Sequence, residues 1–344
     1  MRRLGSALLS MSLLVGCGPT ESAPPAEPSA PADTVQNEQA PLTTTDVDVA
    51  PECEGILQFA NTASFFKLDR YLPSDAANNI IAARTVAPFT TLARLSGVSE
   101  MGPVRLKQLE HGARAEEYID QSCLGIYDEL ALSQSDAAAI VTLVNTASTN
   151  TLYAVLPYAW NGATSLINLR PFTSVLGISD AFGIGAVSLR NLRNAATIGY
   201  SLDMLVSAVN ALPEDEWEVK MSTGFNIETI LDGAYGTDRL ASADCFGIDL
   251  TGRSGQFEDR GYLADATEVR NYVHSAVSTA NRYNAIDADI VTDGKADLAA
   301  RTAGRTFKGC HMHYENGPWA GVQVHFFVDT ASDFRILTVQ HWVE

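Results

Sequence analysis

The middle of the chain contains an internal repeat, and this repeat constrains the fold more than any other feature of the sequence. Asn61-Thr62-Ala63-Ser64 returns as Asn145-Thr146-Ala147-Ser148, and Pro88-Phe89-Thr90 returns as Pro171-Phe172-Thr173. From these prolines the two segments align without a gap as far as Ala113 and Ala196. The repeat predicts a duplicated structural unit, with copy 1 at about 60–114 and copy 2 at about 144–199.

Each copy has the sequence pattern of several short helices. Apolar residues recur at helical spacings, and Pro73 and Pro88 mark turns between the helices of copy 1. A tight turn at Met101-Gly102-Pro103 precedes a further helix, and the matching turn of copy 2 reads Phe182-Gly183-Ile184-Gly185. Glycine lets another backbone come close to such a turn, and the next helix presents free N–H groups there. Residues 51–213 are therefore predicted to form an all-α domain.

The order of these motifs resembles the helix-hairpin-helix family, and within it the ComEA-like module of competence DNA receptors. The resemblance covers both copies, about a third of the chain. It implies that DNA is bound through its phosphates by hairpin glycines and nearby basic side chains. The residues that match are Gly102, Arg105 and Lys107 in copy 1 and Gly183, Gly185, Arg190 and Arg193 in copy 2. Copy 1 departs from the family at Glu100, where a glycine is expected, and a carboxylate is unfavourable beside a phosphate.

Charge both limits and permits this interpretation. Without its first sixteen residues the chain has 21 Lys and Arg against 41 Asp and Glu, which argues against a general nucleic-acid binder. Copy 1 nevertheless has a net charge of +3 and copy 2 of +2. A phosphate-binding surface needs local positive charge, so we expect weak, salt-sensitive DNA binding. The alternative is that these charges lie on solvated faces of a helical scaffold that meets a protein partner in the envelope.

The N-terminus has the features of an export signal. Two arginines precede an apolar run from Leu4 to Val15, which is too short to span a bilayer. Leu14-Val15-Gly16-Cys17 resembles the bacterial lipobox, which implies that 1–16 is a lipoprotein signal peptide and that Cys17 is lipidated. An ordinary cleaved signal with an incidental cysteine is the alternative. The prediction is an extracytoplasmic protein anchored to a membrane of the cell envelope, and the sequence does not tell which membrane.

Residues 17–50 are rich in Pro, Ala, Thr, Ser and Glu and contain no aromatic side chain. Such a segment buries too little apolar surface to offset the entropy lost on ordering, so it is predicted to be a disordered tether. Four cysteines follow it, and an even number in an exported protein indicates disulfides. A local pairing is favoured, Cys53 with Cys123 and Cys245 with Cys310.

The sequence pattern of residues 214–344 is different and predicts an α+β domain with a small antiparallel sheet. Two β-rich runs, 321–329 and 334–343, flank a short turn, and 265–281 has an amphipathic helical pattern. This domain has a net charge of −10 and resembles no family. His311, His313 and His325 could form a metal or acid–base site, and the aspartates at 287, 289, 293 and 297 could bind calcium. Sheet-face histidines and a solvated acidic loop are favoured instead.

No motif for phosphoryl transfer, dinucleotide binding or serine hydrolysis occurs in the chain. The prediction is therefore a multi-domain, non-enzymatic lipoprotein without cofactor or metal. DNA binding through the hairpins is the first hypothesis and an envelope interaction scaffold is the second. An enzyme with its site around the histidines of the last domain is the third.

Overall fold

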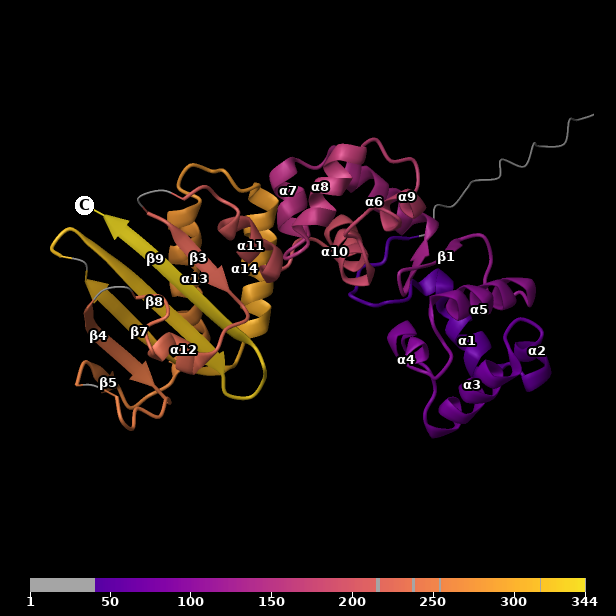
Figure 1. Cartoon of the computed structure of the whole chain (residues 1–344), viewed down its shortest axis with the longest axis horizontal. Coiled ribbons are helices and arrows are strands. Elements are labelled where there is room, and N and C mark those ends of the chain that lie inside the picture. The colour runs from indigo at the N-terminus through magenta and orange to yellow at the C-terminus, as the bar shows by residue number, and fades with distance from the viewer. Residues whose placement is uncertain (1–40, 215–216, 237–238, 254, 316, 344) are drawn as a thin grey trace, which may run out of the picture. The chain divides into compact units, whose positions relative to one another are not determined.

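The computed structural model describes residues 41–214, 217–236, 239–253, 255–315 and 317–343. The sequence repeat corresponds to two successive sets of five helices (Figure 1). The helices of copy 1 are α1 (Glu54–Thr62), α2 (Phe65–Asp69), α3 (Ser74–Val86), α4 (Leu92–Ser96) and α5 (Pro103–Ala115). Those of copy 2 are α6 (Gln134–Thr146), α7 (Thr149–Val155), α8 (Trp160–Leu169), α9 (Val175–Ser179) and α10 (Ala186–Thr197). A 3₁₀ helix, η1 (Pro51–Cys53), precedes copy 1.

The repeated residues make the same contacts in both copies. The Asn61 side chain donates to the carbonyl of Phe89 at 2.9 Å and accepts from its N–H at 2.8 Å. Asn145 makes the same pair of hydrogen bonds with Phe172, at 2.8 and 2.9 Å. An amide side chain can donate and accept at once, so one asparagine satisfies both backbone groups of a loop residue. The shared residues of the repeat thus hold the first helix of each copy to the loop before its fourth.

A two-stranded antiparallel sheet follows the helices of copy 1 and corrects the prediction that residues 51–213 are all-α. Its strands are β1 (Cys123–Tyr127) and β2 (Leu130–Ser133). The turn residues Asp128 and Glu129 both have positive φ, 44° and 63°, as a tight two-residue hairpin requires. The apolar runs beside this turn are only a few residues long, and such runs are ambiguous between strand and helix.

The segment before η1 is packed against both copies, which corrects the boundary of the predicted tether at residue 50. The Thr43 N–H and hydroxyl both bind Asp136, at 2.9 and 2.6 Å. Val49 forms a parallel β-bridge with Ala131, and Val49 and Ala50 are buried. Composition alone predicts disorder here, but specific partners in β2 and α6 hold these residues in place. The rest of the predicted tether, with Cys17 and the signal peptide, lies outside the described residues.

The C-terminal region forms a seven-stranded mixed sheet, so the prediction of a small antiparallel sheet was wrong. The strand order is β3-β9-β8-β7-β4-β5, and β6 pairs with β7 beside this path. Among the described strands of this sheet, only β4 and β5 pair in parallel. The strands are β3 (Val219–Ser222), β4 (Arg239–Phe246), β5 (Phe257–Asp259), β6 (Ala264–Asp265), β7 (Thr306–Glu315), β8 (Ala320–Asp329) and β9 (Arg335–Val343).

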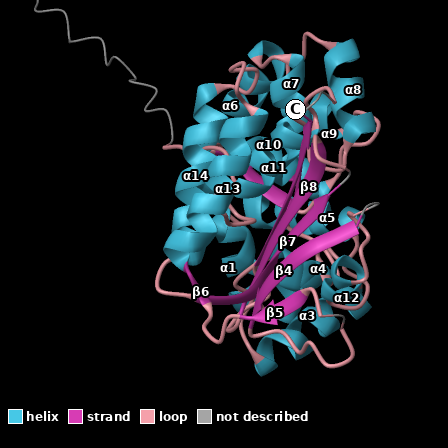
Figure 2. Cartoon of the chain, turned by 90° about the vertical axis from the view of Figure 1, so that its left-hand side faces the viewer, coloured by secondary structure: helices cyan, strands magenta, loops and turns pink. Residues whose placement is uncertain are grey.

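Three helices cover one face of this sheet and share a hydrophobic core with it (Figure 2). They are α11 (Leu202–Asn210), α13 (Ala266–Ala280) and α14 (Ala288–Thr302). The apolar stripe predicted over 265–281 is the buried side of α13. On the other face a second core packs beneath the short helix α12 (Ile227–Leu231). Helix α11 is part of this C-terminal core although it precedes residue 213, because Leu205 and Val209 are buried there.

Both disulfides join the predicted partners. Cys53 binds Cys123, which ties η1 to β1, and Cys245 binds Cys310 at a directly paired position of β4 and β7. Disulfides persist in oxidising compartments, so the two bonds indicate an extracytoplasmic environment. Among the described residues, no helix has the length and hydropathy needed to cross a membrane.

Candidate functional site

The helical hairpins of the two copies place their predicted glycines at equivalent positions. Gly102 is the residue immediately before α5, and Gly185 is the residue immediately before α10. A Cβ atom added to either glycine would meet nothing within 4 Å. Both glycines therefore leave open space in front of a helix N-terminus, where the first N–H groups of the helix lack partners within the helix.

The turn of each hairpin also contains one residue in the left-handed region. Gly183 has a φ of 82° and Glu100, at the same position of copy 1, has a φ of 70°. A Cβ on Gly183 would come within 2.6 Å of the backbone nitrogen of Gly162, so helix α8 packs directly on this turn. Gly183 is consequently a packing residue, and the hairpin of copy 1 forms the same turn with a glutamate.

The two predicted arginines of copy 2 are held by the segment before η1. Arg190 Nε donates to Asp46 Oδ1 at 2.6 Å and its NH2 group donates to the Asp46 carbonyl at 3.1 Å. Arg193 is 1% exposed, donates to the carbonyl of Val47 and lies 3.6 Å from Asp46 Oδ1. Burial lowers the pKa of the Arg193 guanidinium. For Asp46, partial burial opposes ionisation, but hydrogen bonds from Asn194 and Arg190 outweigh it and the pKa is lowered.

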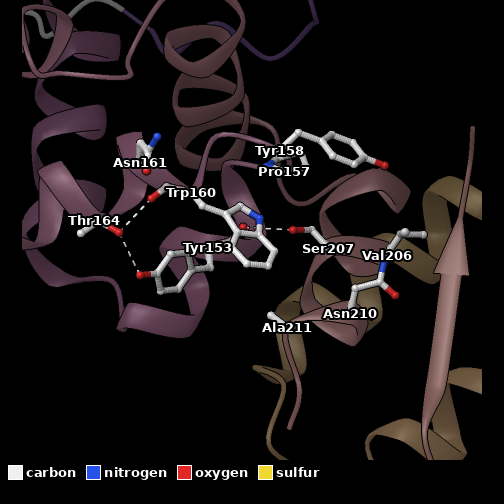
Figure 3. Close-up of a pocket in the computed structure, with 10 residues that line it drawn as sticks. All are labelled: Tyr153, Pro157, Tyr158, Trp160, Asn161, Thr164, Val206, Ser207, Asn210 and Ala211. Carbon is white, nitrogen blue, oxygen red and sulfur yellow. Dashed lines mark hydrogen bonds between the residues drawn. The ribbon is translucent and has the colours of Figure 1, made fainter. Parts of the chain in front are cut away.

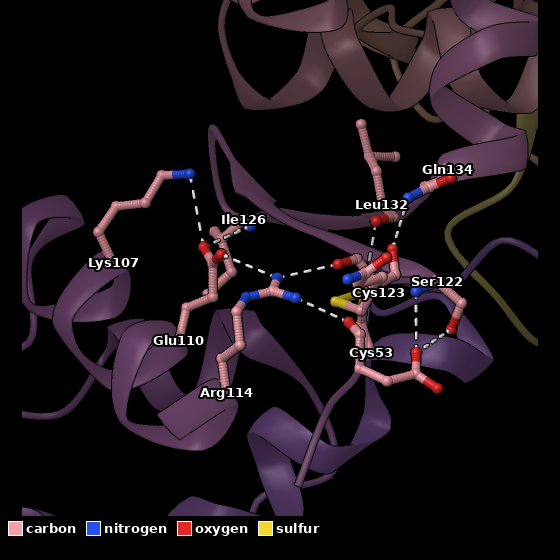
Figure 4. A network of polar contacts seen from close by, with 11 residues as sticks. Cys53, Lys107, Glu110, Arg114, Ser122, Cys123, Ile126, Leu132 and Gln134 are labelled. Atoms are coloured by element: carbon pink, nitrogen blue, oxygen red, sulfur yellow. Dashed lines mark hydrogen bonds and ion pairs between the residues drawn. A yellow bond between two sulfur atoms is a disulfide. The ribbon is translucent and has the colours of Figure 1, made fainter. Parts of the chain in front are cut away.

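The basic residues of copy 1 also have partners within the chain. Lys107 lies 3.5 Å from Glu110 Oε2 (Figure 4). Its Nζ atom also lies 4.3 Å from the centre of the Tyr127 ring. Glu110 in turn binds Arg114 and accepts from the N–H of Ile126 at 2.9 Å, so it links α5 to β1. Arg105 differs from the other three predicted cations because its guanidinium donates a hydrogen bond, at 2.7 Å, to the neutral side chain of Gln108.

The structure thus places the hairpin glycines before α5 and α10 and the predicted basic residues within these two helices. It also pairs three of the four basic residues with carboxylates. Asp46 was missed because it lies in the segment that composition assigns to the tether. The sequence around Asp46 gave little indication of its role, since an aspartate among threonines and valines does not show which residue it pairs with.

A second cluster of polar residues lies beneath α13, on the sheet face that the helices cover. His311 on β7 and His325 on β8 are directly paired, and their Nδ1 atoms are 3.0 Å apart. His311 Nε2 lies 2.8 Å from Glu268 Oε1 on α13. Arg260 binds both carboxylate oxygens of Glu268, at 2.6 and 2.8 Å. The Tyr272 ring stacks on His311 with centroids 4.2 Å apart.

Burial determines the charge of this cluster. It lowers the pKa of His325 to about 3, and the nearby His311 and His313 add to the effect. Burial also lowers the pKa of His311, although Glu268 partly opposes this. Both imidazoles are therefore neutral at pH 7. Since a carboxylate only accepts, His311 Nε2 carries the proton toward Glu268, and His325 Nδ1 donates to His311 Nδ1.

The geometry favours a structural role for these histidines. His325 is 8% exposed, so a substrate has little access to it. His325, His311, Glu268 and Arg260 also form a continuous chain of hydrogen bonds with one another. His313 points to the same face but stacks on Trp342, with centroids 6.2 Å apart. Across the described parts of the chain, no group of three or more His, Cys, Asp or Glu side chains is placed to hold a metal ion. Arg260 and Glu268 were missed because their sequence neighbours carry no recognisable motif.

The aspartates considered for calcium belong to α14 or precede it, and two of them hold α11 in place. Asp293 Oδ2 accepts from the N–H of Tyr200 at 3.1 Å, and Asp297 Oδ2 accepts from the N–H of Leu202 at 2.8 Å. Asp297 also pairs with Arg301 at 2.9 Å. These carboxylates therefore satisfy backbone donors at the start of α11, where free N–H groups need acceptors.

No known protein family, curated protein or solved structure matches the chain.

Proposed function

We propose that this chain is a lipid-anchored, non-enzymatic protein of the cell envelope whose duplicated helical modules form a scaffold for a protein partner. One observation carries this proposal: Arg190 and Arg193 both pair with Asp46, and Arg193 also donates to the Val47 carbonyl. Affinity for DNA comes largely from cations that neutralise phosphates and release counterions. Cations that already pair with carboxylates of the same chain contribute little to that term.

The surface of the second hairpin also fits a protein partner better than a phosphate. Phe182, in the turn, is 76% exposed, and Val187, in the first turn of α10, is 74% exposed. Apolar side chains gathered on an exposed turn are more typical of protein interfaces than of a phosphate-binding surface. We expect Val187→Glu to abolish cross-linking to the partner in cells. Val104→Glu, at the equivalent and similarly exposed position of copy 1, is the matched control.

Anchoring through Cys17 rests on the lipobox-like sequence, and the oxidising environment that the disulfides indicate supports it. Several acyl chains on one cysteine would anchor the protein firmly, since each buried methylene contributes about 0.8 kcal/mol. Metabolic labelling with an alkynyl fatty acid tests this point. Label should enter the wild-type protein and be lost in Cys17→Ala. Equal labelling of both proteins would refute the anchor.

DNA binding through copy 1 is the second candidate, because Arg105 has a neutral partner and Gly102 borders open space. Fluorescence anisotropy with a labelled duplex across a salt series separates the two functions. The protein should be the whole chain from Gly18, since α11 belongs to the C-terminal core and a shorter fragment would expose it. The scaffold predicts no binding at low salt. Binding that falls steeply with salt and disappears in Arg105→Glu, Lys107→Glu would establish DNA binding and overturn the scaffold.

A further inference from the structure

A pocket lined by aromatic side chains lies between copy 2 and helix α11 (Figure 3). It has a volume of about 440 Å³. Tyr153 of α7, Tyr158 of the following loop and Trp160 at the start of α8 form one side, and Ser207 and Asn210 of α11 form the other. A volume of this size lies within the range of small-ligand sites.

The walls of the pocket are fixed by hydrogen bonds within the protein. Ser207 donates to the Tyr153 carbonyl at 3.0 Å, and the Tyr153 and Thr164 hydroxyls lie 3.1 Å apart. Asn210 donates to the Met221 carbonyl at 2.8 Å and accepts from the Met221 N–H at 2.9 Å. Both ends of the Asn210 amide are therefore occupied, and the hydrogen bonds within the protein hold the walls in place.

The rim differs from the walls because its polar groups are free. Tyr158 is 84% exposed and Trp160 is 65% exposed, which is unusual for such large aromatic side chains. Within the part of the chain that the structure describes, no hydrogen bond engages the Tyr158 hydroxyl, the Trp160 indole N–H or the Asn161 amide. These groups offer donors and acceptors beside two exposed rings.

The pocket is also where the two copies diverge. The capping Ser64 of copy 1 precedes the first residue of α3, Ser74, by ten positions, whereas Ser148 precedes Trp160 by twelve. Copy 2 is thus two residues longer at this point, and the longer segment contains both exposed rings. Tyr158 has a φ of 64°, a left-handed conformation that bulky residues rarely adopt. Strain of this kind is concentrated at binding sites.

We propose that this pocket binds a neutral carbohydrate. Among the residues that the structure describes, no carboxylate, ammonium, guanidinium or imidazole group lines the pocket, so a charged ligand would find no counter-charge there. A purely apolar ligand would make no hydrogen bond with the rim donors and acceptors. A sugar ring has a flat C–H face that stacks on tryptophan or tyrosine, and hydroxyls around its edge that both donate and accept. A proline-rich peptide also stacks on aromatic rings, but proline has no N–H to offer the Asn161 carbonyl.

The test uses the chain from Gly18 with cellotriose, chitotriose and maltotriose as probes, followed by tryptophan fluorescence and saturation-transfer NMR. At least one trisaccharide should bind. Trp160→Ala should weaken binding about tenfold, because one stacking contact is lost. Trp319→Ala is the matched control, since Trp319 is 63% exposed directly before β8, does not line the pocket and should leave binding unchanged.

Asn161→Ala provides a second variant that removes no aromatic ring, and it should also weaken binding because the sugar loses a hydrogen bond. Three results would overturn the proposal: no trisaccharide binds, binding survives in Trp160→Ala, or a polyproline peptide binds in place of the sugars. This site is independent of the proposed scaffold, because the DNA and cross-linking experiments change residues outside the pocket.

Discussion

Glu100 and Gly183 occupy the same position in the two copies and share a left-handed backbone conformation, with φ of 70° and 82°. Glycine adopts this conformation without steric cost, whereas a residue with a Cβ atom does so at a penalty of about 1 kcal/mol. The two hairpins therefore have the same geometry although only one of them has the residue best suited to it.

The first prediction concerns this pair. Glu100→Gly should raise the free energy of unfolding by about 0.5–1 kcal/mol, because glycine relieves the strain and loses only some chain entropy. Gly183→Glu should be strongly destabilising, since its Cβ would clash with the Gly162 backbone. Urea denaturation measures both variants. A loss of stability in Glu100→Gly would show that the glutamate side chain contributes more than its backbone costs.

The second prediction separates the two arginines of copy 2. Arg193→Ala should lower the free energy of unfolding by about 3 kcal/mol, because a buried cation that binds Val47 and Asp46 is removed. Arg190→Ala should cost less than about 1 kcal/mol, because its ion pair with Asp46 is partly exposed and screened by solvent. Equal effects in urea denaturation would contradict the assignment of Arg193 to the folded core.

The third prediction is a dependence of stability on pH. The pKa of His325 falls from 6.5 in the unfolded chain to about 3 in the folded protein, so the unfolded state binds a proton first as the pH falls. The stability present above pH 6.5 is then lost toward pH 3, by up to about 1.4 kcal/mol per pH unit. The lowered pKa of His311 adds in the same direction.

Between pH 6.5 and about 5 this loss precedes the protonation of most carboxylates. His325→Gln should therefore flatten the stability curve in that window, measured by urea denaturation at a series of pH values. His341→Gln is the control, since His341 lies on β9 outside the cluster. An unchanged curve in His325→Gln would mean that His325 is not buried in its neutral form.

The fourth prediction concerns the disulfide between Cys53 and Cys123. The bond closes a loop of 70 residues, and the entropy removed from the unfolded chain corresponds to about 4 kcal/mol. Both cysteines are almost fully buried, so we replace them with alanine, because serine would bury two hydroxyls. The double variant should lose stability by nearly this amount in chemical denaturation. A loss well below it would indicate that the unfolded chain keeps these segments close together.

Local patterns predicted much of the helical part of the chain. The repeat anticipated two equivalent units because the same asparagines and prolines recur, and the structure gives the two asparagines the same contacts. The cysteines were paired correctly because each disulfide joins two cysteines that follow one another along the chain within one predicted domain. The single helix expected over 265–281 is α13, whose apolar stripe has a clear helical period.

The extent of the sheet could not be predicted in the same way. Strand β3 pairs with β9, and β4 pairs with β7, so each partner lies far away in the sequence. Neither β4 nor the three-residue β5 has a clean alternation of buried and exposed positions. The pairing of Asp46 with Arg190 is equally long-range, and composition alone assigned Asp46 to the tether. The predicted DNA-binding site therefore lacked Asp46, the distant residue that pairs with two of its arginines.

The strap formed by residues 43–50 has a mechanical consequence. It binds α6 through Thr43, α10 through Asp46, α4 through Asp48 and β2 through Val49. A pull that reaches residue 43 along the chain must break these contacts with both copies one after another before it reaches η1. The bond pair at Asp136 and the ion pair at Arg190 must yield first, and the Cys53–Cys123 disulfide then stops further extension. The copies consequently resist tension at their N-terminal side as one unit.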